Sequence, residues 1–132
     1  MGKSLINNQL KQIVEELGYV LININKKNNR LFVIIQDTQG YFYNVNFYNL
    51  NRGKLPRKFC KQNEFTIYNI KLWCKLNTKN YELISDKYID DNNKLIFKDE
   101  YGYFYFVKFS SFQNYSPRNT LFWQRKNSHA ET

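Results

Sequence analysis

Apolar residues recur at helical spacing in two stretches of the chain. The first apolar stripe consists of Leu10, Ile13, Val14 and Leu17, and the second consists of Ile67, Ile70, Trp73 and Cys74. Residues three and four positions apart share one face of a helix, so both stretches are predicted to be amphipathic helices. Ser4 and Thr66 are the predicted N-caps, because a hydroxyl there accepts from an unpaired backbone N–H. Gly18 and the polar segment 77–80 are expected to end these helices.

Each predicted helix is followed by a short strand and a polar loop. The strands cover residues 19–24 and 81–85, which contain Tyr, Ile and Leu. Aromatic and β-branched residues are favoured in strands. Asn, Asp, Lys and Arg make up the segments 25–30 and 90–94. We therefore expect both segments to be loops.

Alternation of apolar and polar residues predicts a β-hairpin in each half of the chain. The first strands are expected at 31–36 and 95–98, and the turns at 37–40 and 99–102. Each turn opens with Asp and closes with Gly, which adopts positive φ without strain. One face of the second strands is expected in the core; its residues are Tyr41, Tyr43, Val45 and Phe47 in the first half and Tyr103, Tyr105, Val107 and Phe109 in the second.

The other face of these second strands differs between the halves. Asn44 and Asn46 in the first half correspond to Phe106 and Lys108 in the second. A face that is free to differ is a place where two related units can specialise.

The two halves repeat one order of elements at an offset of 62 positions. Residues 4–65 align with residues 66–127 without a gap. Each half closes with a short, mainly helical segment around a proline, at 48–58 with Pro56 and at 110–119 with Pro117. We predict an α+β fold of two tandem repeat units, each helix–strand–β-hairpin–short helix, followed by a flexible tail at 128–132.

The charge of the chain indicates a negatively charged partner. Lys and Arg number 20 against 11 Asp and Glu, which gives a formal net charge of +9. Such a charge attracts nucleic acid, an anionic membrane or an acidic protein surface. No apolar run approaches the length of a membrane span, and the N-terminus lacks the pattern of a secretory signal. We expect a cytoplasmic protein of a bacterial host cell, with Cys60 and Cys74 as reduced, partly buried thiols.

The densest group of cations lies in the acid-free segment 52–61. The candidate binding residues in this segment are Arg52, Lys54, Arg57, Lys58 and Lys61, and their counterparts in the second half are Arg118, Trp123, Arg125 and Lys126. Arg and Lys in a loop at a helix end bind backbone phosphates, and Trp123 can stack on a base. Two alternatives remain open: a basic surface that is merely solvated, and a Trp123 that holds the C-terminus to the core.

Residues that support catalysis or metal binding are sparse. His129 is the only histidine, and a structural zinc site needs four Cys or His ligands, whereas the chain holds two Cys and one His. The acidic pairs Asp90-Asp91 and Asp99-Glu100 are typical of solvated turns. Gly-rich phosphate loops and nucleophile motifs do not occur. We predict a protein without enzymatic activity, metal or cofactor.

Part of the chain resembles a known family over roughly residues 30–120. The residues that carry the resemblance are Thr66-Ile67-Tyr68-Asn69-Ile70-Lys71-Leu72-Trp73-Cys74-Lys75-Leu76-Asn77, Tyr81-Glu82-Leu83-Ile84-Ser85, Lys94-Leu95-Ile96-Phe97-Lys98 and the turn Pro56-Arg57-Lys58-Phe59. They resemble the treble-clef, zinc-ribbon-like repeats of phage and bacterial proteins, which often lie beside Vsr-like or HNH homing endonuclease domains.

In that family one Cys pair lies in the hairpin turn and another beside the later proline. The corresponding neighbourhoods here contain no cysteine; they are 36–40 with 55–58, and 99–102 with 116–119. The resemblance therefore implies a scaffold without zinc, in which ladder hydrogen bonds and aromatic packing hold the hairpins. It also implies nucleic-acid binding.

Two functions from different classes fit these observations. The first is a DNA- or RNA-binding module of a phage or mobile element, DNA being the favoured ligand, that contacts phosphates through the basic surface. The second is a phage-encoded inhibitor of the anti-CRISPR type, which binds a host defence nucleoprotein complex directly. An abundance of Asn, Lys, Ile, Tyr and Phe, typical of an AT-rich genome, is compatible with both. A pull-down after nuclease treatment separates them, because only the inhibitor would retain a protein partner.

Overall fold

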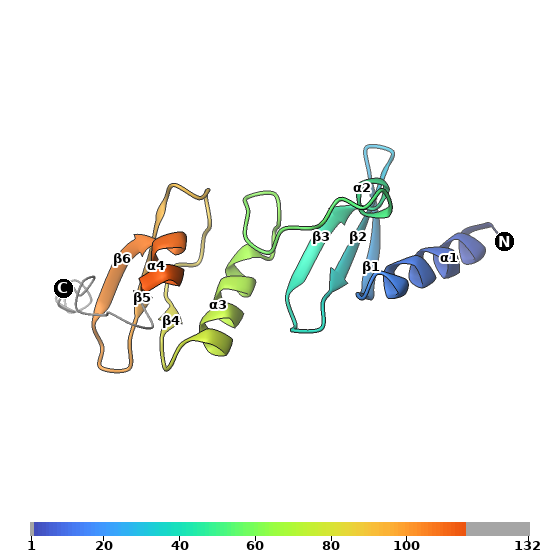
Figure 1. The fold of residues 1–132 in the computed structure, drawn as a ribbon. Coiled ribbons are helices and arrows are strands. Elements are labelled where there is room, and N and C mark those ends of the chain that lie inside the picture. Colours follow the sequence, from blue (N-terminus) through green and yellow to red (C-terminus); the bar gives the residue numbers. More distant parts are fainter. Residues whose placement is uncertain (1, 116–132) are drawn as a thin grey trace. The chain divides into compact units, whose positions relative to one another are not determined.

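Two three-stranded antiparallel sheets and four helices make up a small α+β fold in the computed structural model, which describes the backbone of residues 2–115 and the side chains of residues 8–114 (Figure 1). The helices are α1 (Gly2–Glu16), α2 (Phe47–Asn51), α3 (Thr66–Asn77) and α4 (Phe109–Tyr115). The strands are β1 (Val20–Lys27), β2 (Arg30–Gln36), β3 (Phe42–Asn46), β4 (Glu82–Leu83), β5 (Lys94–Lys98) and β6 (Phe104–Lys108). The predicted α+β class is confirmed.

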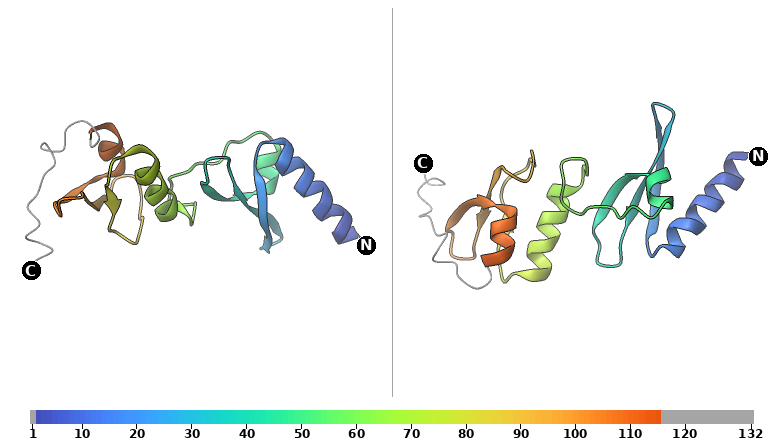
Figure 2. Two further views of the ribbon diagram at one scale, coloured as in Figure 1. Left: turned by 90° about the horizontal axis from the view of Figure 1, so that it is seen from below. Right: turned by 45° about the horizontal axis from the view of Figure 1, so that its top comes forward.

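The chain divides into two compact units, each with its own sheet. The N-terminal unit contains the residues up to Lys58 together with Asn63–Phe65. The C-terminal unit contains Phe59–Gln62 and the residues from Thr66 onward. Figure 2 shows the sheets β1-β2-β3 and β4-β5-β6 in two further views.

The β2–β3 and β5–β6 hairpins have matching registers. In the first, the partners are Phe32↔Asn46, Val33↔Val45, Ile34↔Asn44, Ile35↔Tyr43 and Gln36↔Phe42. In the second, they are Lys94↔Lys108, Leu95↔Val107, Ile96↔Phe106, Phe97↔Tyr105 and Lys98↔Phe104. Every residue of the second set lies 62 positions after its equivalent in the first, as Phe104 does after Phe42.

An aspartate closes each hairpin turn through its side chain. Asp37 Oδ1 accepts hydrogen bonds from the backbone N–H groups of Gln39, Gly40 and Tyr41 at 2.9–3.0 Å, and Asp37 Oδ2 accepts from the Tyr43 hydroxyl at 2.6 Å. Gly40 has φ of +105°, the left-handed conformation that glycine tolerates. The predicted Asp–Gly turn is therefore confirmed.

The second turn repeats this arrangement. Asp99 Oδ1 accepts from the N–H groups of Tyr101 and Tyr103, and Asp99 Oδ2 accepts from the Tyr105 hydroxyl. Gly102 has φ of +90°.

The core of the N-terminal unit lies where α1 and α2 meet the sheet. Its buried apolar residues are Leu10, Val14, Val33, Ile35, Tyr41, Tyr43 and Leu50. Gly18 ends α1 as predicted: the Tyr19 N–H bonds the Val14 carbonyl and the Gly18 N–H bonds the Glu15 carbonyl, which is the pattern of a Schellman cap.

Two details of the first helix differ from the prediction. The helix begins at Gly2, so Ser4 lies inside it and is not the N-cap. Neither proline nor glycine follows Gly2 until Gly18, so nothing interrupts the helical backbone at Ser4. Leu17 follows the last helical residue and is 46% exposed, so it does not join the buried stripe.

The core of the C-terminal unit is formed by α3, α4 and one face of the sheet. It contains Ile70, Cys74, Leu83, Leu95, Phe97, Tyr105, Val107, Phe109 and Phe112, with Ile67 and Trp73 packed against it. The predicted stripe of α3 is confirmed. Aromatic packing is dense here, since the Phe97 and Phe112 rings stack with centroids 3.9 Å apart.

Thr66 does not have the role that the sequence indicates. It is the first residue of α3, and its hydroxyl turns away from the helix end to the preceding loop. The hydroxyl accepts from the Cys60 N–H at 3.0 Å and donates to the Cys60 carbonyl at 2.6 Å. Both bonds are buried, so the threonine fixes the loop that leads into α3.

The predicted loop at 25–30 is wrong. Strand β1 continues to Lys27, and Asn28 and Asn29 form a two-residue turn with φ of +53° and +62°. Positive φ at both central positions is typical of a type I′ turn, which asparagine tolerates. β1 and β2 therefore form a hairpin, with Lys27 opposite Arg30.

Four other segments are shorter than predicted. Strand β4 covers Glu82–Leu83 alone. The Ser85 hydroxyl accepts a hydrogen bond at 2.8 Å from the Ile96 N–H, which would bond a backbone carbonyl if the ladder were longer.

The strands β3 and β6 end before Phe47 and Phe109, the first residues of α2 and α4. The Asn46 side chain caps α2 by accepting from the Asn49 N–H. α2 then ends at Asn51, well before Pro56, and Pro117 lies outside the described residues.

Candidate nucleic-acid interface

The basic segment leaves α2 through a tight helix end. The Lys54 N–H bonds the Asn49 carbonyl and the Gly53 N–H bonds the Leu50 carbonyl, both at 3.0 Å. Gly53 has φ of +94°, so the chain reverses direction there. This geometry turns the following residues into an irregular loop.

Asn63 fixes the far end of this loop. Its side chain is 6% exposed, and its Nδ2 donates to the carbonyls of Phe42 and Arg57 at 3.0 Å and of Lys58 at 3.4 Å. The Phe42 carbonyl belongs to β3, and the carbonyls of Arg57 and Lys58 belong to the loop. A buried amide thus joins the basic loop to the sheet of the N-terminal unit.

The cations of the loop fall into two groups. Arg52, Lys54 and Arg57 are exposed. Lys58 is half-buried, with Nζ 5.3 Å from the Tyr41 ring centroid. The Arg52 guanidinium lies 5.0 Å from the Tyr48 ring centroid. Such contacts are favourable, because the negative face of an aromatic ring attracts a cation.

The predicted site is not a single surface of one unit. Arg52, Lys54, Arg57 and Lys58 belong to the N-terminal unit, whereas Lys61 belongs to the C-terminal unit. The neighbouring Phe59 explains this difference, because its ring packs on Phe109 with centroids 4.7 Å apart. The remaining candidates, Arg118, Trp123, Arg125 and Lys126, lie outside the described residues, as does the predicted tail 128–132.

Comparisons of the chain with family models, curated proteins and solved structures find no match.

The described residues contain neither a cluster of metal ligands nor a helix that could span a membrane. Within residues 2–115, three or more His, Cys, Asp or Glu side chains do not gather at any point in a way that could hold a metal ion. Within the same range, no helix has the length and apolar character needed to cross a membrane.

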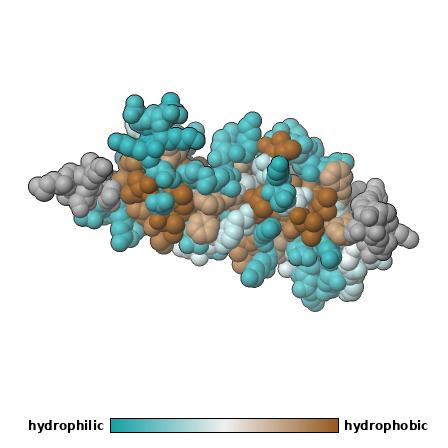
Figure 3. Space-filling model, turned by 180° about the vertical axis from the view of Figure 1, so that it is seen from behind, coloured by the Kyte–Doolittle hydropathy of each residue, from teal (hydrophilic) through white to brown (hydrophobic). Residues whose placement is uncertain are grey.

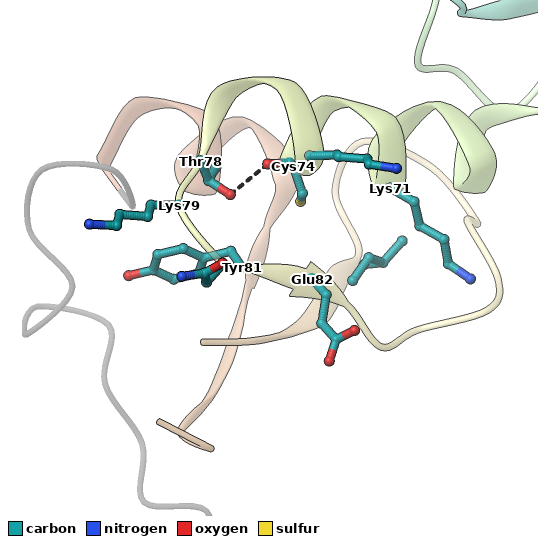
Figure 4. Close-up of a pocket in the computed structure, with 9 residues that line it drawn as sticks. Lys71, Cys74, Thr78, Lys79, Tyr81 and Glu82 are labelled. Atoms are coloured by element: carbon teal, nitrogen blue, oxygen red, sulfur yellow. Dashed lines mark hydrogen bonds between the residues drawn. The ribbon is translucent and has the colours of Figure 1, made fainter. Parts of the chain in front are cut away.

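A surface pocket of about 530 Å³ lies between the end of α3 and the segment that leads into β4. Figure 4 shows Lys71 and Lys79 on opposite sides of it, with Glu82 across from α3. The Thr78 hydroxyl donates to the Cys74 carbonyl at 2.6 Å. Burial raises the pKa of the Cys74 thiol to about 12. The thiol is therefore protonated at neutral pH, and a protonated thiol is a weak nucleophile.

Tyr43 and Tyr105 are among the described tyrosines with raised pKa values. Burial is the larger cause for Tyr43, followed by its hydrogen bond to Asp37; the same causes act on Tyr105 through Asp99. Both hydroxyls stay protonated as donors. Their role is to hold the hairpin turns.

Sequence reasoning missed a second cationic surface, on the C-terminal sheet. Hydrophobic residues reach the molecular surface beside hydrophilic ones (Figure 3). Among them, Phe106 of β6 is 54% exposed and lies under Lys94 Nζ, 5.6 Å from the ring centroid. The available signal was the replacement of Asn44 and Asn46 by Phe106 and Lys108 at equivalent positions.

Proposed function

We propose that the protein binds nucleic acid without catalysing a reaction, and that the loop from Arg52 to Lys58 contacts the phosphate backbone. The observation that carries the proposal is an exposed group of cations on a loop that is held at both ends. Arg52, Lys54 and Arg57 are exposed, and Gly53 and Asn63 fix the backbone around them.

The local charge supports a phosphate ligand. No acidic residue occurs in the sequence between Asp37 and Glu64, so the charged residues within this segment of the chain are all positive. Arg presents several N–H donors in a fixed plane and binds phosphate oxygens in pairs. A loop held in place loses little conformational freedom when it binds.

We further propose that the chain arose by duplication of a unit of 62 residues related to treble-clef repeats. The equal registers of the two hairpins, with an Asp–Tyr hydrogen bond in each, support the duplication. The order of β2, β3 and α2, a hairpin followed by a short helix, supports the relationship. In the family, a pair of metal-binding cysteines holds the hairpin turn. In this proposal the Asp37 carboxylate holds the turn instead, by accepting hydrogen bonds from three backbone N–H groups.

The test is a salt titration of binding, with two sets of charge reversals. Fluorescence anisotropy would measure the affinity of the wild-type chain for labelled duplex and single-stranded oligonucleotides between about 50 and 200 mM salt. The first variant carries Arg52→Glu, Lys54→Glu and Arg57→Glu. We expect its salt slope to fall by about 0.9 for each phosphate contact that is lost.

The matched control carries Lys11→Glu, Lys26→Glu and Lys27→Glu. These lysines are also exposed and belong to the same unit, so the control undergoes the same change in net charge. It should bind far better than the first variant. Equal weakening by both sets would mean that general charge, and not the loop, determines binding, and would overturn the assignment of the loop.

A further inference from the structure

The strands β5 and β6 bring six side chains to the side of their sheet that faces away from the core. Leu95, Phe97, Tyr105 and Val107 alternate with these residues and are buried against α3 and α4. Directly opposite partners share a face in an antiparallel pair. The outer face therefore consists of the pairs Lys94–Lys108, Ile96–Phe106 and Lys98–Phe104.

The charges on this outer face destabilise the folded chain when no ligand is bound. Lys94 and Lys108 lie directly opposite each other, and like charges at such positions are destabilising. Among the register partners of β4, β5 and β6, Glu82 is the single acidic residue, opposite Lys98 at the β4 edge. A bound anion would relieve the repulsion between the two lysines.

Aromatic rings lie between the cations. Phe106 is 54% exposed and Ile96 36% exposed. Lys94 Nζ is 5.6 Å from the Phe106 centroid, and Lys98 Nζ is 5.9 Å from the Phe104 centroid. The face thus offers an apolar centre with a lysine beside each ring.

The equivalent face of the N-terminal unit is different because other residues cover it. The Phe65 ring packs on Phe42 with centroids 5.5 Å apart. Glu64 accepts from the Asn44 side chain, and Asn63 donates to the Phe42 carbonyl. The register partners on that face include no cation, since they are Phe32–Asn46, Ile34–Asn44 and Gln36–Phe42.

These covering residues have no chemical equivalent in the second half of the sequence. At an offset of 62, Asn63, Glu64 and Phe65 correspond to Arg125, Lys126 and Asn127. The aromatic ring of Phe65 is thus replaced by the amide of Asn127, and the carboxylate of Glu64 is replaced by the cation of Lys126.

We propose that the outer face of β5 and β6 binds single-stranded nucleic acid, with unpaired bases stacked on Phe106 and Phe104 and with phosphates against Lys94, Lys98 and Lys108. Exposed aromatic side chains on a sheet stack bases of any sequence, and neighbouring cations follow the backbone. In a duplex the bases are already stacked on one another, so the rings favour single strands. This inference rests on the proposed nucleic-acid binding and adds the class of ligand.

The test compares Phe106→Ala with Tyr101→Ala in the full chain. Tyr101 is a matched control, because it is an exposed aromatic residue of the same unit, 75% exposed, but lies in the hairpin turn. Anisotropy would measure the binding of a labelled single strand of about 12 nucleotides and of the corresponding duplex. We expect Phe106→Ala to weaken single-strand binding by about 5-fold to 100-fold, the loss of one stacked base. Tyr101→Ala and duplex binding should change less than about 2-fold.

A second variant separates stacking from a general loss of structure. Phe106→Trp keeps an aromatic face and should restore wild-type affinity for the single strand. If the wild-type chain binds nucleic acid and Phe106→Ala binds single strands equally well, the face is not the site, while the proposed function stands. If Phe106→Ala lost equal affinity for the duplex and for the single strand, the proposed stacking of bases would also be overturned. Absence of binding by the wild-type chain to either oligonucleotide would overturn both proposals.

Discussion

The aspartates of the two hairpin turns show how much structure one residue determines. The sequence predicts that Asp37 opens a turn, and the hydrogen bonds that its Oδ1 accepts confirm it. The bond from the Tyr43 hydroxyl to Oδ2 was not predicted. Turn preferences concern the backbone of four residues, whereas this bond also requires the strand after the turn to direct Tyr43 back toward the carboxylate.

Replacement of Asp37 by alanine should destabilise the N-terminal unit by about 2–4 kcal/mol. The substitution removes a charged acceptor from three backbone N–H groups and leaves the buried Tyr43 hydroxyl without this partner. Urea unfolding followed by circular dichroism would measure the loss.

The matched control for that experiment is Asp90→Ala. Asp90 is also a half-buried turn aspartate, but its side chain accepts from the Asn92 N–H in an exposed hydrogen bond. Its replacement should cost less than about 1 kcal/mol. Equal costs for the two variants would show that the extra hydrogen bonds of Asp37 add nothing to stability.

At the scale of elements, the sequence predicts those whose apolar pattern is regular. The buried stripe of α3 and both Asp–Gly hairpins follow from helical spacing and from alternation. The last three residues of β1, Asn25, Lys26 and Lys27, do not, because they are polar and exposed on both faces. Strand formation there depends on pairing with β2 and on the turn at Asn28 and Asn29. The composition of the segment predicts neither of these features.

The turn residues provide a test of this explanation. Asn29→Val should destabilise the β1–β2 hairpin by about 1–2 kcal/mol, because a β-branched residue is strained at φ of +62°. Asn29→Gly should be neutral or stabilising, since glycine adopts this φ freely. Amide hydrogen exchange in β1 and β2, together with urea unfolding, would measure both effects. If valine were tolerated as well as glycine, the backbone conformation at Asn29 would not be what determines the turn.

At the scale of the molecule, the candidate site could be predicted only in part. The sequence locates the cations of the basic loop, since their density is visible along the chain. It does not show that Lys61 belongs to another unit, because that follows from the packing of Phe59 on the distant Phe109. Nor does it show that Lys94 and Lys108 are directly opposite, which requires the strand register.

Both units should lose stability together at high pH. Burial and the Asp hydrogen bonds raise the pKa values of Tyr43 and Tyr105 above their ordinary value of 10.0. A raised pKa in the folded state means that this stabilisation is complete below pH 10 and is lost as the pH rises, because the unfolded chain ionises first. Each tyrosine should contribute a decline of at most about 1.4 kcal/mol per pH unit.

The double variant Tyr43→Phe with Tyr105→Phe tests this pH dependence. It keeps every lysine, so the titration of lysine is common to both proteins. The variant will be less stable at neutral pH, and the quantity to compare is the slope of unfolding free energy between pH 10 and higher values. A slope as steep as that of the wild-type chain would assign the alkaline loss to other groups.

The path of the chain between the units determines how it can be divided. Phe59–Gln62 pack with the C-terminal unit, and Asn63–Phe65 then return to the N-terminal one. A cut at the repeat boundary, after Phe65, removes Phe59 and Cys60 from the fragment that uses them to cover Phe109 and to bond Thr66. An intact N-terminal fragment has to extend through Phe65, and an intact C-terminal fragment has to begin at Phe59. The two fragments overlap, so a single proteolytic cleavage cannot release both units whole.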